Sequence, residues 1–162
     1  MIMIKKPNRR ELREKVLQIL YAYEMNSDGL ALLKEGMFSD IEEKNDKEFC
    51  NLLIDYTLVN KKDLDKKIGQ RVDNWEMNRI ALIDKILLRM GIAEILYFQD
   101  IPPKVSINEV IEISKNYSTP NSGKFINGIL DAILAELKST GKLNKTGRGL
   151  IDVTFRKPSG KR

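Results

Sequence analysis

Apolar residues recur at helical spacing along most of the chain. Leu12 and Val16 lie one turn apart, and the pattern around them predicts an amphipathic helix over residues 9–25, capped by Asn8. Almost nothing in the chain alternates between apolar and polar positions, as a strand would require. The one candidate is residues 150–155, which could form a short strand or an extended arm. The pattern as a whole predicts an all-α protein.

The middle of the chain predicts helices of differing character. Residues 27–44 are polar and form either a loop or a short helix. Residues 83–98 are apolar almost all the way round, which is typical of a helix in the middle of a bundle. The few charges of this helix should therefore lie at its ends or be paired. Helical spacing predicts further helices over residues 49–59, 61–68, 106–117 and 122–137. The stretch over 61–68 is either the rest of the helix before it or a short separate helix.

The last two helices have boundaries with their own local chemistry. The prolines at 102–103 stop any incoming helix, and Ser106 and Glu109 form a Ser-x-x-Glu capping box. The next helix should therefore begin near Ser106. Residues 118–123 are turn residues that separate it from the final helix. In that helix Phe125 lies at the margin of the apolar face, where it should be half exposed.

The helical pattern is interrupted around Trp75, the only tryptophan, and this marks the expected boundary between two subdomains. We expect an N-terminal helical subdomain over residues 1–74 and a C-terminal one over residues 75–138, with Trp75 sealing their junction. Residues 139–162 form a basic tail, whose glycines predict flexibility.

Charge is distributed unevenly along the 162 residues. The net charge is +5, with 42% hydrophobic and 31% charged residues, as in an ordinary globular protein. Residues 1–15 hold six Lys or Arg against two acidic residues, and residues 139–162 hold seven against one. Both ends are basic while the middle is acidic. Such ends favour nucleic acid as a partner, because each phosphate that they neutralise releases a counterion.

Several classes of function are excluded by composition. There is no histidine and only one cysteine, Cys50, which is expected to be a packing residue. Neither a serine or cysteine nucleophile with a histidine base nor a zinc site is therefore expected, and we predict no enzyme, no metal and no cofactor. No apolar run is long enough for a membrane span, so we expect a cytoplasmic protein.

The first helix carries the main candidate for nucleic-acid binding. Lys6, Arg9, Arg10 and Arg13 fall within a sector of about 100° on the helical wheel, and Tyr21 lies further along the same side. Arginines can pair with backbone phosphates, and an aromatic ring can stack on an unpaired base. A solvated charged face with Tyr21 in the core is the alternative interpretation.

Three segments of the sequence resemble the signature blocks of a known family. They are NRRELREKVLQILYAYE near the start, IDKILLRMGIAEILY in the centre, and IPPKVSINEVIEISKNYSTPNSGKFINGILD near the end. They resemble NusB, the family of bacterial transcription antitermination factors, over about residues 8–137. The resemblance implies an all-α fold of two packed three-helix bundles.

The resemblance also implies a function and partners. Members of the family bind boxA, a single-stranded RNA element in the leaders of ribosomal RNA operons, together with NusE, a small-subunit ribosomal protein. The complex helps RNA polymerase to read through terminators. One alternative is a homodimeric protein-interaction module whose self-association covers the arginine face. Another is a fragment of an RNA methyltransferase, but the chain has no room for a nucleotide-binding α/β domain.

The RNA-binding residues of the family correspond to nine positions of this sequence. Arginines would fix the RNA backbone, aromatic rings would stack on bases, and Gln18 and Asp84 would contact base edges. Two departures from the family pattern are Glu11, which interrupts the arginine run, and Asn121, where many relatives have an acid. The expected RNA-binding residues are Arg9, Arg10, Arg13, Gln18, Tyr21, Asp84, Asn121, Lys124 and Phe125.

Overall fold

The structure, a computed structural model, describes residues 5–151, except for the side chains of Asn74 and Trp75. Within this range the chain forms eight α-helices and one short 3-10 helix, and no residue belongs to a strand. The all-α prediction is confirmed. None of these helices is both long and apolar enough to cross a membrane. The expected role of Trp75 at a junction falls outside the described side chains.

Contacts within the chain divide it into two compact units, Met1–Val59 and Asn60–Arg162. The interrupted helical pattern predicted a boundary after residue 74. The two positions differ because helix α4 (Lys61–Gly69) packs against α6 (Leu82–Tyr97), which belongs to the second unit. A helix whose apolar face is covered by α6 shares the core of that unit, and the interruption of the pattern around residue 74 falls inside it.

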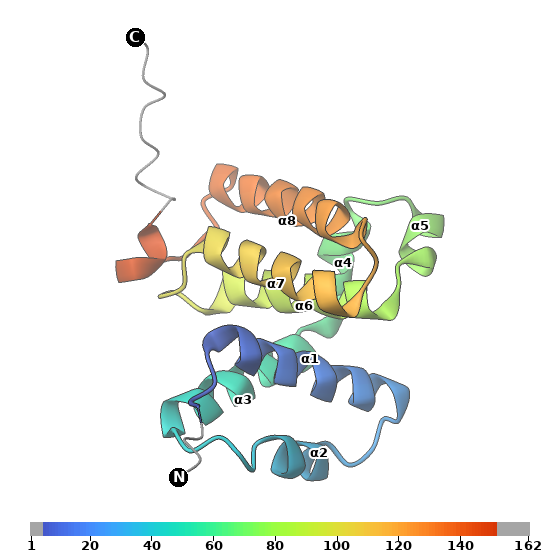
Figure 1. The fold of residues 1–162 in the computed structure, drawn as a ribbon. Helices are drawn as coiled ribbons and strands as arrows, with labels where there is room; N and C mark the ends of the chain where they lie inside the picture. Colours follow the sequence, from blue (N-terminus) through green and yellow to red (C-terminus); the bar gives the residue numbers. More distant parts are fainter. Residues whose placement is uncertain (1–4, 152–162) are drawn as a thin grey trace. The chain divides into compact units, whose positions relative to one another are not determined.

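The first unit contains α1 (Arg9–Met25), α2 (Leu30–Met37) and α3 (Lys44–Val59) (Figure 1). Asn8 caps α1 as predicted, because its side-chain oxygen accepts a hydrogen bond from the backbone N–H of Glu11 at 2.9 Å. Helix α1 packs against both other helices. Its apolar face and that of α3 form the core, with Leu12, Val16, Leu17, Ile19, Phe49, Leu53 and Ile54 buried.

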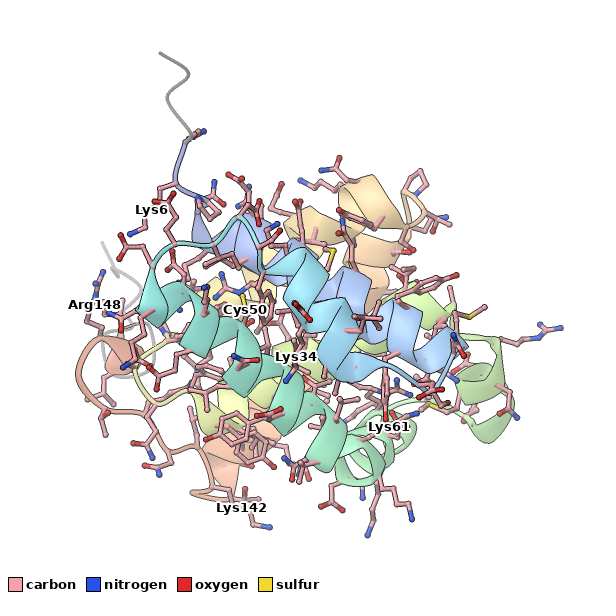
Figure 2. The ribbon with its side chains drawn as sticks, turned by 90° about the horizontal axis from the view of Figure 1, so that it is seen from below. Lys6, Lys34, Cys50, Lys61, Lys142 and Arg148 are labelled. Carbon is pink, nitrogen blue, oxygen red and sulfur yellow. The ribbon has the colours of Figure 1, made fainter. Side chains whose placement is uncertain are left out.

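Helix α2 is the least buried element of this unit. None of its residues is buried, and it follows Gly29, whose φ of 71° lies in the left-handed region that glycine adopts without strain. Lys34 pairs with Asp55 of α3 at 3.6 Å, and Figure 2 shows the Lys34 side chain on the side of α2 that faces α3. Residues 27–44, for which the sequence predicted either a loop or a short helix, therefore contain a short helix.

The second unit contains α4, α5 (Asn74–Arg79), α6, α7 (Pro103–Tyr117) and α8 (Ser122–Ser139) (Figure 1). Helices α6, α7 and α8 pack against one another. Most of α6 is buried, as its all-round apolar character predicted. A Cβ at Gly91 would lie 2.9 Å from Leu130 Cδ1, so this glycine lets α6 approach α8 closely.

The two charged residues in the middle of α6, Arg89 and Glu94, have polar partners, as expected for a buried helix. Arg89 Nε donates to Asp65 Oδ1 of α4 at 2.7 Å. Glu94 is fully buried, and its Oε1 accepts a hydrogen bond from Ser106 Oγ at 3.0 Å. Since a buried charge is costly unless it has partners, these bonds explain how a core helix tolerates both residues.

The predicted start of α7 is wrong. The helix begins at Pro103, about one turn before Ser106. Proline is favoured at this first position, because its missing N–H would have no intrahelical partner there. Ser106 is fully buried and donates to Glu94, so it does not form the capping box expected with Glu109.

The segment after α8 packs against the C-terminal end of α6, although the sequence predicted flexibility from residue 139. Lys145 is buried, and its Nζ donates to the carbonyl oxygens of Glu94 at 3.1 Å and Phe98 at 2.6 Å. A Cβ at Gly149, in the 3-10 helix Gly147–Leu150, would lie 1.9 Å from the carbonyl oxygen of Gln99. Lys142 and Arg148 extend outward (Figure 2). The rest of the tail, and with it most of the possible strand over residues 150–155, lies outside the described residues.

Candidate nucleic-acid interface

The nine predicted RNA-binding residues divide between the two units. The first unit carries five of them on α1, and the second carries four at the starts of α6 and α8. Each group is described within its own unit. They are Arg9, Arg10, Arg13, Gln18 and Tyr21 in the first unit, and Asp84, Asn121, Lys124 and Phe125 in the second.

An exposed face of α1 carries Arg10, Gln18 and Tyr21. All three side chains are exposed, with Tyr21 at 38%. Arg10 and Tyr21 are about 20° apart on the helical wheel, because three turns of helix separate them. Gln18 lies about 80° from Arg10, so the face presents a cation, an amide and an aromatic ring within one sector, the combination needed to hold a phosphate and a base. Tyr21 is not a core residue, contrary to the alternative interpretation of this helix.

The other two arginines of α1 stack on a buried ring. The guanidinium carbons of Arg9 and Arg13 lie 4.1 Å and 5.3 Å from the centroid of Phe49 in α3. Arg13 is only 3% exposed, whereas Arg9 is exposed. Cation–π contacts of this kind hold a guanidinium in place. The predicted arginine row is thus split: Arg10 faces solvent, Arg9 lies at the edge, and Arg13 is part of the packing between α1 and α3.

In the second unit, three of the four predicted residues line one open pocket of about 390 Å³. Asp84 comes from the first turn of α6, Asn121 precedes α8, and Phe125 lies in the first turn of α8. Phe125 is 36% exposed, as its marginal position on the wheel predicted. Lys124 is exposed beside it but does not line the pocket. The full lining comprises Glu76, Arg79, Ile80, Ala81, Asp84, Thr119, Asn121, Ser122 and Phe125.

The carboxylate of Asp84 is engaged within the protein. Its side chain is 7% exposed, and its two oxygens accept hydrogen bonds from Ser118 Oγ at 2.7 Å and Ser122 Oγ at 2.9 Å. Each oxygen could accept a second bond, but at 7% exposure the carboxylate offers little surface to a base edge. The role in base contact that the resemblance implied for Asp84 therefore remains a prediction that the geometry does not favour.

Two charged residues of the pocket were not predicted from the sequence. Glu76 and Arg79 belong to α5, the short helix in the interrupted part of the pattern. Arg79 is exposed at the C-terminal end of that helix and adds a cation to the rim of the pocket. Its position five residues before Asp84 was the available signal, but only the fold brings α5 to the start of α8.

The first unit holds the single cysteine. Cys50 is fully buried, its Sγ lies 3.8 Å from the carbonyl oxygen of Leu12, and Figure 2 places it within the unit. Burial, together with the nearby carboxylate of Asp46, raises the pKa of the Cys50 thiol to about 12. It is a packing residue, as expected. Across residues 5–151, no cluster of histidine, cysteine or acidic side chains is suited to hold a metal ion.

These features define a class of protein. It is an all-helical protein that exposes polar and aromatic side chains on one face of α1 and has an open pocket with an aromatic residue, Phe125, at the start of α8. The sequence profile of the NusB family matches residues 10–135. The chain belongs to the NusB family.

Curated relatives agree over most of the chain. It is 47% identical to a transcription antitermination protein NusB from Chloroherpeton thalassium over 152 residues, covering 93% of this chain and 72% of the relative. It is 46% identical to the protein of the same name from Salinibacter ruber over 149 residues, covering 89% of this chain and 91% of the relative. Relatives of this kind confirm the prediction that the chain is not an enzyme.

Solved structures share the fold. T. maritima NusB superposes with a TM-score of 0.72 at 34% identity, covering 82% of this chain and 94% of that one. A chain in a crystal structure of the antitermination factors NusB and NusE in complex with double-stranded RNA superposes with a TM-score of 0.71 at 22% identity, covering 79% and 96%. The NusB-like fold that the resemblance implied is confirmed.

Proposed function

We propose that this protein is an RNA-binding transcription antitermination factor. It binds the single-stranded boxA element in the leaders of ribosomal RNA operons together with NusE, and it promotes read-through by RNA polymerase in the cytoplasm. The observation that carries the proposal is the 47% identity to a transcription antitermination protein over 93% of the chain. The crystal structure of a NusB with NusE and RNA supports the choice of partners.

The exposed face of α1 suits the backbone and one base of the RNA. Arg10 offers a guanidinium to a phosphate, and Tyr21, at 38% exposure, offers part of its ring for stacking. Gln18 lies on the same exposed face and can both donate to and accept from a base edge. In this proposal Arg9 and Arg13 contribute mainly through their stacking on Phe49.

The start of α8 suits a second stretch of RNA. Phe125 offers a partly exposed ring at the pocket, and Lys124 beside it offers a cation for a phosphate. Asn121 supplies a neutral amide, so the pocket repels a phosphate less than it would with an acid at this position. Arg79 adds positive charge at the rim.

A binding titration tests the proposal. The full chain is titrated with boxA RNA and with a scrambled RNA of the same composition, with and without NusE, at two salt concentrations. We expect tighter binding of boxA than of the scrambled RNA when NusE is present. Equal affinity for both RNAs under these conditions contradicts specific recognition, because electrostatic attraction alone does not depend on sequence.

Two lysines of α8 provide a test variant and a matched control for the proposed RNA surface at the start of that helix. Lys124 and Lys138 are both exposed, at opposite ends of the same helix. Lys124→Ala should weaken boxA binding and reduce the salt slope by about one, whereas Lys138→Ala should change neither. Equal effects of the two substitutions would show that only the net charge matters.

A homodimeric interaction module is the second candidate function. It is favoured by two exposed apolar side chains in the first unit, Met25 at 66% and Leu32 at 74% exposure. Sedimentation velocity over a range of protein concentrations separates the two candidates. A monomer at all concentrations removes the second, and a dimer that dissociates when boxA RNA is added would show that self-association covers the RNA surface.

A further inference from the structure

We propose that Asp84 is a positioning residue for the RNA surface of the second unit. It holds the loop between α7 and α8 and the first turn of α8, so that Asn121, Lys124 and Phe125 are presented in a fixed geometry. In this role it does not contact RNA. The inference rests on the proposed function and deepens it, because it assigns Asp84, the acidic residue among the predicted RNA-binding residues, a structural task.

The hydrogen bonds of Asp84 connect distant parts of the sequence. Oδ1 accepts from Ser118, the residue after the last residue of α7, and Oδ2 accepts from Ser122, the first residue of α8. The two serines stand at the two ends of the loop. One carboxylate in the first turn of α6 therefore fixes both ends of the loop at once, with distances of 2.7 Å and 2.9 Å.

The hydroxyl protons of the loop can be assigned consistently. Each serine has one proton, and each uses it on Asp84. Ser122 Oγ lies 3.0 Å from Thr119 Oγ1, so Thr119 can donate to Ser122 while Ser122 donates to the carboxylate. Ser118 Oγ and Ser122 Oγ lie 2.8 Å apart, side by side on the same carboxylate. All three hydroxyl groups of the loop belong to one network around Asp84.

The charge of Asp84 is also accommodated by the helices around it. Asp84 lies in the first turn of α6 and bonds the first residue of α8, so its negative charge lies at the N-terminal ends of two helices. The positive ends of both helix dipoles stabilise a carboxylate there. An acidic side chain can thus stand beside an RNA-binding surface without presenting its full charge to a phosphate.

One of the two serines allows a clean test. Ser122 lines the pocket, but Ser118 does not. Ser118→Ala removes a bond to Asp84 without changing the wall of the pocket. Asp84→Asn is the complementary variant: its amide N–H₂ can donate to Ser122, which can donate to Ser118, which can donate to the amide oxygen. Asparagine therefore preserves the network, and alanine does not.

The first measurement needs no RNA. Amide hydrogen exchange over residues 118–125 is compared in the full-length wild type, Ser118→Ala, Asp84→Asn and Asp84→Ala, with Ser139→Ala at the other end of α8 as the control. We expect faster exchange in Ser118→Ala and Asp84→Ala, and wild-type exchange in Asp84→Asn and the control. Unchanged exchange in Ser118→Ala would overturn the positioning role, whatever the RNA results.

The second measurement is boxA binding in the presence of NusE, with a panel of boxA sequences changed one base at a time. We expect Ser118→Ala to lose about tenfold in affinity, as for one lost bond to a charged group, and Asp84→Asn to stay close to wild type with the same order of base preference. An altered base preference in Asp84→Asn would show that Asp84 reads a base directly, and would overturn the inference. Should wild type bind no boxA while the exchange results hold, the proposed function fails and the positioning role stands.

Discussion

Arg10 and Arg13 are neighbours in sequence with different surroundings. Arg10 is exposed on α1, whereas Arg13 is 3% exposed and stacks on Phe49. The sequence predicted equal roles, because the helical wheel places both arginines in one sector. The wheel could not show that α3 brings an aromatic ring against part of that sector. Burial of Arg13 is thus a property of packing between helices, which local spacing does not encode.

The two arginines should therefore respond differently to truncation. Arg10→Ala should weaken boxA binding and lower the salt slope by about one, since one phosphate contact is lost. Arg13→Ala should leave the slope unchanged and lower the free energy of unfolding by about 1–2 kcal/mol, because it removes a buried cation–π contact. Salt-dependent titrations and urea unfolding of both variants check this. A reduced slope for Arg13→Ala in a stably folded protein would restore it to the RNA surface.

Phe125 is the aromatic residue whose partial exposure the sequence predicted. It lies at the edge of the apolar face of α8 and is 36% exposed at the pocket. Phe125→Ala should cost about 1–3 kcal/mol of boxA binding if the ring stacks on a base. The free energy of unfolding should also fall, by about 1–2 kcal/mol, because most of the residue is covered at 36% exposure. Wild-type affinity of a folded Phe125→Ala protein would mean that the ring only packs.

At the scale of elements, apolar periodicity predicted most of the helices. Helix boundaries predicted from local capping residues were wrong where a contact with another helix took the capping side chain. The cap at Asn8 formed as expected, because it needs only its own helix. The capping box at Ser106 did not form, because the buried carboxylate of Glu94 takes the Ser106 hydroxyl and Pro103 begins the helix instead. The pocket was only partly predictable for the same reason, since α5 reaches it through the fold.

Close packing of α6 on α8 can be tested with two glycines. At Gly91 a Cβ would lie 2.9 Å from the buried Leu130 side chain, whereas at Gly128 of α8 nothing lies within 4 Å. Gly91→Ala should lower the free energy of unfolding by about 1 kcal/mol, because overpacking exceeds the gain in helix propensity. Gly128→Ala should raise it by about 0.5–1 kcal/mol. Urea unfolding measures both, and a stabilised Gly91→Ala protein would contradict the close approach.

At the scale of the whole molecule, the sequence shows that both ends of the chain are basic. It does not show which of these basic side chains are exposed and which are buried. Lys145 was counted with a flexible basic tail, yet it is buried at the end of α6. Burial lowers the pKa of Lys145 to about 8, although Glu94 and Asp100 oppose the shift. Only the long-range contact between residues 94–98 and 145 reveals this, and nothing in the local sequence signals it.

The lowered pKa of Lys145 predicts how stability depends on pH. The group has a pKa of about 8 when folded and its ordinary value of 10.5 when unfolded, so between these pH values the unfolded chain binds more protons. The free energy of unfolding should therefore rise from about pH 8 to 10 relative to a Lys145→Met variant. Urea unfolding of both proteins at several pH values checks this. Ionisation of Cys50 in the unfolded chain affects both proteins alike, and a constant difference between them would contradict the prediction.

The contacts of residues 145–149 with the C-terminal end of α6 also determine how much of the chain is needed for the second unit to fold correctly. The family profile ends at residue 135, but the ammonium group of Lys145 satisfies two carbonyl oxygens at the end of α6, and Gly149 fits against Gln99. A stop codon placed soon after α8 would retain every recognisable motif and still expose the end of the central helix to water. Deletion mapping guided by motif boundaries alone would then mistake a folding defect for loss of an RNA contact.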